Sequence, residues 1–183
     1  EQPLGDDIVK LNTNENPYPP GPKVAHCLSQ IGVDSLRRYP PPLANDFRIA
    51  AAQRHQVAPE NIIPTNGGDE FLRLVMTTFV GAGETMAVTR PSYSLYPVLA
   101  EIQDSKLVEI ALEDDWSMPK NFAQRLNELN AKLAIIVNPH APTGSLLDSN
   151  YLAEIAREFR GVLLIDEAYV DFIDPCLLYP SES

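Results

Sequence analysis

Two apolar runs with one helical pattern between them, within residues 133–172, constrain the fold of this chain more than any other feature. The first run, Leu133–Val137, contains three β-branched residues and is followed by Asn138; the second, Val162–Ile165, is followed by Asp166. A strand, a crossover helix and a second strand make the two strands parallel. Asn138 and Asp166 therefore follow the carboxyl ends of parallel strands, which is the edge where open α/β sheets bind ligands.

The rest of the chain continues this alternation of helices and strands. Apolar spacing predicts helices over 23–31, 43–56, 95–103 and 119–130, a further helix with Phe71, Leu72, Val75, Met76 and Phe79 on one face, and strands over 84–89 and 106–112. The predicted class is α/β with a mainly parallel sheet.

Composition excludes several classes of partner. The 183 residues carry a formal net charge of −11, which argues against a nucleic-acid surface and against an anionic membrane face. No apolar run approaches the length that spans a membrane. Cys27 and Cys176 have no metal-binding or redox spacing, so we expect a protein of the reducing cytoplasm without a metal site.

The sequence Thr65-Asn66-Gly67-Gly68-Asp69 precedes the helix that contains Phe71. Two glycines at a helix start allow the backbone to approach an anion, and the first amides of a helix are available to bind a phosphate. A tight turn with Asp69 as the N-cap explains the same residues equally well.

Two proline-rich segments near the N-terminus each allow two interpretations. Residues 11–18 form a stiff polar segment that ends in Tyr18, and this segment is either a solvated tail or a recognition element. Arg37, Arg38 and Tyr39 precede three prolines, and we favour a linker with solvated charges over an anion contact.

Several strand ends and loops are predicted to converge on one edge of the sheet. Their side chains match a flat, phosphorylated, cationic ring, of which pyridoxal phosphate is the obvious candidate. Its phosphate would lie at the helix start at Gly68, and its ring would stack on Tyr93. Asp166 would pair with the ring nitrogen, and Asn138 and Tyr169 would bind the ring hydroxyl oxygen.

These residues belong to motifs that resemble the pyridoxal-phosphate-dependent aminotransferases of fold type I. The segments LNTNENPYPPGP, RYPPP, NGGDE, RPSYSLY, NPHAPTG and IDEAYVDF stand in family order over nearly all of the chain. NPHAPTG with IDEAY marks the superfamily, and the first two segments resemble its histidinol-phosphate branch. The resemblance implies a three-layer sandwich of the aspartate aminotransferase type, with an arm over residues 1–42 and part of a large domain over residues 43–183.

The resemblance also implies a role for each matching residue. Gly68 and Asp69 would bind the cofactor phosphate through backbone groups, Tyr93 would stack on the ring, Asn138 and Tyr169 would reach the ring oxygen, and Asp166 would hold the ring nitrogen. Tyr39 would reach the cofactor phosphate of a neighbouring subunit, which implies a homodimer, and Tyr18 would line the substrate pocket. His140 is interpreted as a tolerated variant and not as a catalytic base.

The implied activity is amino transfer between L-glutamate and imidazole-acetol phosphate in histidine biosynthesis, with small-molecule substrates. The family's Schiff-base lysine lies in a downstream Ser-Lys segment that this sequence lacks, so we expect a fragment that is inactive alone and contributes no catalytic residue. The alternatives are another aminotransferase, an enzyme similar to threonine-phosphate decarboxylase, a non-catalytic cofactor-binding fragment, and a nucleotide-binding domain. The last is weakened by the absence of a GxGxxG motif.

Overall fold

A computed structural model describes residues 15–173 and divides the chain into two compact units, Glu1–Pro64 and Thr65–Ser183. Each unit is described by itself. In the described part of the chain, no helix combines the length and the apolar character needed to cross a membrane.

The first unit is helical. It contains α1 (Pro22–Ser29), η1 (Val33–Arg37), α2 (Asn45–His55) and η2 (Pro59–Asn61). Arg48 in α2 joins this helix to the segment after it, because its Nε donates to the carbonyl oxygens of Pro59 and Ile62, both at 3.0 Å. The helices predicted over 23–31 and 43–56 are confirmed, with ends that differ by one or two residues.

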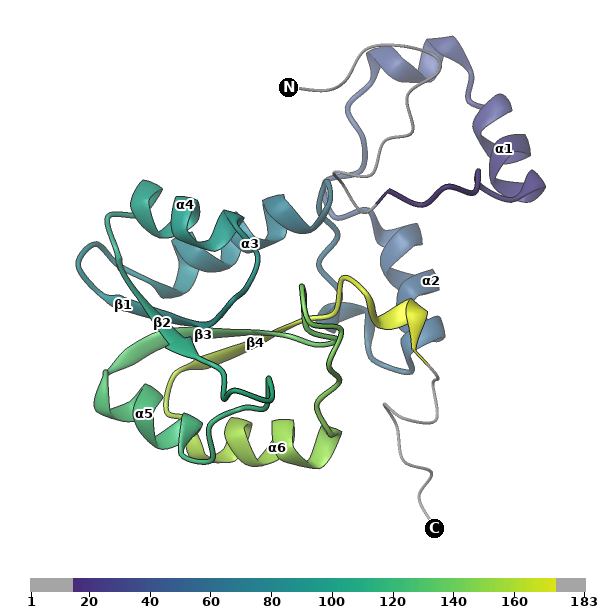
Figure 1. The fold of residues 1–183 in the computed structure, drawn as a ribbon. Coiled ribbons are helices and arrows are strands. Elements are labelled where there is room, and N and C mark those ends of the chain that lie inside the picture. The colour runs from purple at the N-terminus through teal and green to yellow at the C-terminus, as the bar shows by residue number, and fades with distance from the viewer. Residues whose placement is uncertain (1–14, 174–183) are drawn as a thin grey trace, which may run out of the picture. The chain divides into compact units, whose positions relative to one another are not determined.

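A four-stranded parallel sheet forms the centre of the second unit (Figure 1). Its strands are β1 (Thr85–Arg90), β2 (Lys106–Ala111), β3 (Ala131–Val137) and β4 (Val162–Asp166), in the order β2-β1-β3-β4. The predicted strand–helix–strand unit is confirmed: β3 and β4 are neighbours, and Val137 is in register with Asp166.

Helices cover both faces of the sheet (Figure 1). α3 (Gly68–Phe79) and α4 (Leu95–Ile102) pack on one face, and α5 (Phe122–Glu128) and α6 (Ser149–Glu158) pack on the other. Successive residues of β3 enter opposite cores: Leu133 and Ile135 pack with α3 and α4, whereas Ala134 and Ile136 pack with α5 and α6. The predicted α/β class and three-layer sandwich are therefore confirmed.

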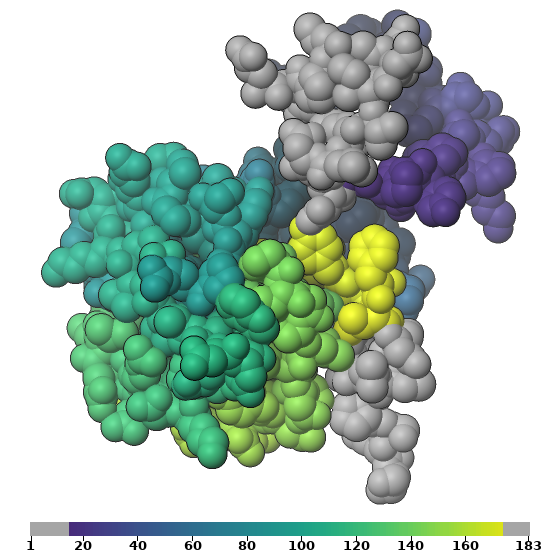
Figure 2. Space-filling view, in the orientation of Figure 1, coloured from purple at the N-terminus to yellow at the C-terminus, as the bar shows by residue number. Residues whose placement is uncertain are grey.

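Because the strands are parallel, their carboxyl ends share one edge of the sheet, which we call the rim. The rim comprises the start of α3 and the loops that follow β1, β3 and β4, that is, residues 67–69, 90–94, 138–148 and 166–169. In the space-filling view, the yellow residues after β4 lie against the light-green residues between β3 and α6 (Figure 2). Tight loops from three strands therefore meet at the rim.

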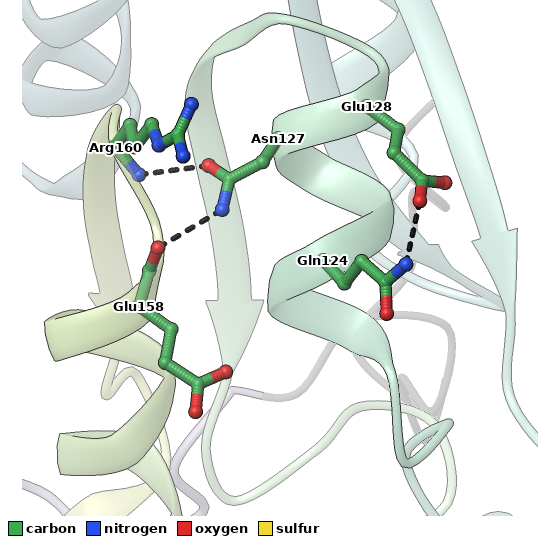
Figure 3. A pocket seen from close by; sticks show the side chains of 5 residues that line it. All are labelled: Gln124, Asn127, Glu128, Glu158 and Arg160. Carbon is green, nitrogen blue, oxygen red and sulfur yellow. Dashed lines mark hydrogen bonds between the residues drawn. The ribbon is translucent and has the colours of Figure 1, made fainter.

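The opposite edge of the sheet carries an open hollow of about 350 Å³ between α5 and α6 (Figure 3). It is lined by Gln124, Asn127, Glu128, Glu158 and Arg160. The Asn127 amide donates to the Glu158 carbonyl oxygen and accepts from the Arg160 amide, both at 2.9 Å. Asn127 therefore fastens the end of α6 to α5, and the residues predicted to bind a ligand lie elsewhere.

Candidate functional site

A continuous set of side-chain contacts crosses the rim from α3 to β4. The Tyr93 hydroxyl donates to Asp69 Oδ1 at 3.3 Å, and the rings of Tyr93 and Tyr96 meet edge to face with centroids 5.6 Å apart. The Tyr96 hydroxyl then donates to Asp166 Oδ2 at 2.8 Å. The structure thus brings together three residues predicted for the site, Asp69, Tyr93 and Asp166, and adds Tyr96 between them.

Asp166 is fixed through both carboxylate oxygens. Oδ2 accepts from Tyr96, and Oδ1 accepts from the Ala168 amide at 3.1 Å. Its backbone carbonyl accepts from the Asn138 amide at 2.9 Å, which ties the end of β4 to the end of β3. The residue is partly buried, so its carboxylate is both oriented and reachable at the rim.

The surroundings of the two phenols keep them protonated. Burial raises the pKa of Tyr96 above its ordinary value, and the hydrogen bond to Asp166 raises it further. Burial also raises the pKa of Tyr93, with Asp69 as the next cause and smaller effects from Tyr169 and Asp166. Both hydroxyls therefore remain hydrogen-bond donors, and Tyr169 is close enough to act electrostatically on both phenols.

The helix start beside this cluster is open. α3 begins at Gly68, its N-cap is Gly67, and no side chain caps it. The interpretation of Asp69 as the N-cap is therefore wrong: Asp69 is the second residue of the helix, and its carboxylate accepts from Tyr93 instead. Gly67 has φ +85°, a conformation that favours glycine, and a Cβ built on Gly67 or Gly68 would meet nothing within 4 Å. The backbone at Gly67 and Gly68 thus has open space beside it, and close approach of an anion to the helix start stays a prediction.

Asn138 lies at the end of β3 as predicted, and its side chain holds the loop that leads to α6. It is buried; its Oδ1 accepts from the Leu147 amide at 2.8 Å, and its Nδ2 is 3.4 Å from the Leu147 carbonyl oxygen. An amide nitrogen carries two N–H donors, so the second donor of Nδ2 is not used by Leu147. The contact with a ring oxygen stays a prediction.

His140 is buried between two rim loops. Its Nε2 lies 3.0 Å from the Pro91 carbonyl oxygen, and its Nδ1 lies 2.8 Å from Thr143 Oγ1. A carbonyl oxygen can only accept, so Nε2 carries the proton and Nδ1 accepts from the threonine. Burial lowers the pKa of His140, and the neutral ring joins the Tyr93 loop to the loop after β3. A role as a general base is not required to explain this residue.

The lowered pKa of His140 predicts a pH-dependent contribution to stability. The unfolded chain binds this proton at higher pH than the folded chain, so the contribution is complete above the ordinary histidine pKa of about 6.5 and falls as the pH drops below it. When the pH is lowered from 7.5 to 5.5, the free energy of unfolding of His140→Gln should fall by less than that of the unsubstituted protein. Urea titration at each pH measures both values. Equal losses for His140→Gln and the unsubstituted protein would contradict the assignment.

Tyr18 and Tyr39 belong to the helical unit and are exposed, at 79% and 101%. Arg37 and Arg38, which precede Tyr39, both pair with Asp34 on the surface, at 2.6 Å and 2.8 Å. These two arginines are thus engaged locally, in agreement with the interpretation as a linker with solvated charges.

Sequence reasoning missed Tyr96 and the Ala168 amide. Tyr96 could have been found, because it lies in the first turn of α4 only three residues after Tyr93, close enough for the two rings to meet. The amide could not, because any residue type supplies the same group and only the turn after β4 directs it to Asp166.

Comparisons with known proteins agree with this architecture. Residues 6–179 match the family described as aminotransferase class I and II. Histidinol-phosphate aminotransferases from Rhodopirellula baltica and Citrifermentans bemidjiense are 39% and 40% identical over 95% and 94% of the chain, and the chain covers 48% and 49% of their lengths. The chain therefore spans about half the length of these curated relatives.

Solved structures share the fold. The histidinol-phosphate aminotransferase of Sinorhizobium meliloti, determined with pyridoxal 5′-phosphate, superposes with a TM-score of 0.81 at 24% identity over 88% of this chain and 44% of that one. A Thermus thermophilus aspartate aminotransferase variant gives 0.72 at 22% identity, over 86% and 44%. The fold is thus that of the aspartate aminotransferases, as the sequence motifs predicted.

Proposed function

Because this chain belongs to the aminotransferase class I and II family, we propose that it forms the cofactor-binding part of a pyridoxal-phosphate-dependent aminotransferase. The observation that carries the proposal is the Asp166 carboxylate, held at the rim by Tyr96 and Ala168 beside the open start of α3. The carboxylate would bind a cationic ring nitrogen, and the helix start would bind a phosphate.

The rim residues fit the chemistry of pyridoxal phosphate. The first amides of α3, at Gly68 and Asp69, would bind the phosphate, and the half-exposed ring of Tyr93 would stack on the pyridine. Ser92, which precedes Tyr93, has a buried hydroxyl with no hydrogen-bond partner among the described residues, and a bound ligand would satisfy it. Tyr169, partly buried in the turn after β4, would bind the ring hydroxyl oxygen.

When bound, the cofactor supplies an electron-withdrawing ring that stabilises negative charge on the substrate carbon. Asp166 would keep the ring nitrogen protonated through a charge-assisted hydrogen bond. The phenol of Tyr93 would cover one face of the ring and exclude water there. Asn138 would reach the ring oxygen together with Tyr169, and it also holds the loop after β3. His140 would act indirectly, because it joins that loop to the loop that contains Tyr93.

The proton-transfer lysine of this mechanism must come from outside the described rim. Lys106 and Lys132 lie at the amino ends of β2 and β3, on the opposite edge of the sheet, and Lys120 is exposed before α5. Lys23 lies in α1 and Lys10 lies outside the described residues. The 183-residue chain alone is therefore proposed to bind the cofactor but not to transfer amino groups.

For the intact protein, we propose transfer of the amino group between L-glutamate and imidazole-acetol phosphate in histidine biosynthesis. The names of the curated relatives and the arm LNTNENPYPP with its Tyr18 support this choice over another aminotransferase or a decarboxylase. A homodimer in the cytoplasm is proposed with it, with Tyr39 reaching the cofactor phosphate of the partner subunit. The full exposure of Tyr39 suits such a contact.

Two assays on the intact protein test the proposal. The first adds pyridoxal phosphate and records the visible spectrum, where a saturable change is expected. The second measures the formation of L-glutamate and imidazole-acetol phosphate from histidinol phosphate, with 2-oxoglutarate as the amino acceptor. Saturable binding with turnover of histidinol phosphate supports the proposed activity. Saturable binding with turnover of other amino acids only would mean that the protein is an aminotransferase with a different substrate. The absence of binding would refute the proposal and leave a nucleotide-binding or non-catalytic domain.

A further inference from the structure

We infer that Tyr96 is a positioning residue that sets the orientation of the Asp166 carboxylate and so the strength of its bond to a ligand ring nitrogen. The inference rests on the proposed function, because it concerns the same cofactor site. It assigns a task to a side chain that would not itself touch the ligand.

The ring and the hydroxyl of Tyr96 make different kinds of contact. The ring is fully buried in the core formed by α3, α4 and the sheet, where a phenylalanine would pack equally well. The hydroxyl leaves this core and donates to Asp166 Oδ2 at 2.8 Å, a bond that joins α4 to the end of β4 across 70 residues of sequence. The hydroxyl thus contributes a contact at the rim that packing of the ring does not require.

Two donors from different elements fix the carboxylate plane. Tyr96 holds Oδ2, and the Ala168 amide holds Oδ1 at 3.1 Å. A carboxylate has about four lone-pair sites, so each oxygen keeps a site for a third donor. A ligand N–H would then meet an acceptor that is already oriented, and little conformational entropy would be lost on binding.

In the hydrogen bond between Tyr96 and Asp166, the phenol is always the donor and the carboxylate is always the acceptor. Burial and the neighbouring Asp166 hold the phenol in its protonated form, so it donates to the carboxylate and does not compete with it for a ligand proton. Without this hydroxyl, Oδ2 of Asp166 would lose its fixed partner, and the Ala168 amide would be the remaining donor that orients the carboxylate.

The test compares Tyr96→Phe with Tyr151→Phe in the intact protein. Tyr151 is a matched control, because its hydroxyl also donates one hydrogen bond, to the Pro119 carbonyl oxygen at 3.2 Å, and because it packs on the face of the sheet opposite Tyr96. The probes are pyridoxamine 5′-phosphate, which cannot form a Schiff base with a lysine, and its analogue with C–H in place of the ring nitrogen. Fluorescence titration gives the Kd of each probe, and thermal unfolding verifies that each variant is folded.

For Tyr96→Phe, we expect about a tenfold weaker Kd for pyridoxamine 5′-phosphate, the size of one lost charge-assisted hydrogen bond, and an unchanged Kd for the analogue. Tyr151→Phe should change neither value. An equal loss for both probes would assign Tyr96 a structural role only, and no loss for either would also overturn the inference. If the unsubstituted protein binds both probes equally, or binds neither, then Asp166 does not contact the ring nitrogen and the proposed function itself is contradicted. If the unsubstituted protein prefers pyridoxamine 5′-phosphate but Tyr96→Phe keeps that preference, only the inference about Tyr96 is contradicted.

Discussion

Asp166→Asn should weaken the binding of pyridoxamine 5′-phosphate to the intact protein by about 100-fold, because the loss of one partner of a desolvated charged pair costs about 2–5 kcal/mol. The substitution preserves the size of the side chain, and its single carbonyl oxygen keeps one of the two acceptors that Tyr96 and the Ala168 amide use. It removes the negative charge that would keep the ring nitrogen protonated. The Kd from fluorescence titration measures the effect.

A matched control separates this local effect from a change in overall charge. Asp114 lies in the exposed acidic turn after β2, which β1 and β3 separate from β4 in the sheet. Asp114→Asn therefore removes the same charge at a distance from Asp166 and should leave the Kd within about twofold. If Asp166→Asn behaves like Asp114→Asn, the carboxylate does not bind the ligand, and the site must be placed elsewhere.

Gly161→Ala should lower the free energy of unfolding by about 3 kcal/mol, which is the upper range for overpacking in a core. A Cβ at this position would lie 2.7 Å from the Ala131 carbonyl oxygen and 2.8 Å from that of Lys132, and it would also clash with the Phe159 ring. The two backbone oxygens belong to β3, which cannot move without disturbing the centre of the sheet. Urea unfolding followed by circular dichroism gives the value.

The control for this substitution is Gly81→Ala in the same unit. A Cβ there would come within 3.1 Å of a single side-chain oxygen of Glu84, which can move aside. We expect a change below about 1 kcal/mol for this control, since surface substitutions usually have small effects. Equal effects at the two glycines would show that the close approach of Gly161 to β3 does not constrain the fold.

The architecture was predictable from the sequence because burial on both faces of a parallel sheet leaves a strong pattern. The strand β3, for example, is apolar at nearly every position, since alternate residues enter opposite cores. Asn138-Pro139 then marks where the strand ends and the following loop begins. Such local patterns also placed α3 and α4 correctly, to within a residue or two.

The direction of individual rim side chains was not predictable in the same way. Asn138 and Asp166 both follow strands, yet one turns inward to hold Leu147 and the other remains at the rim. Strand position determines which edge a residue reaches, but the hydrogen bonds of the following loop determine which way its side chain points. These bonds come from backbone groups, and backbone groups are the same for every sequence.

The most direct test of this account is a crystal structure of the intact protein with pyridoxal 5′-phosphate. We predict that the ring nitrogen lies within hydrogen-bond distance of the Asp166 carboxylate, that Tyr93 stacks on the ring, and that the phosphate contacts the amides at the start of α3. A cofactor bound away from the rim, or one at the rim with its phosphate beside Asp166, would contradict the account.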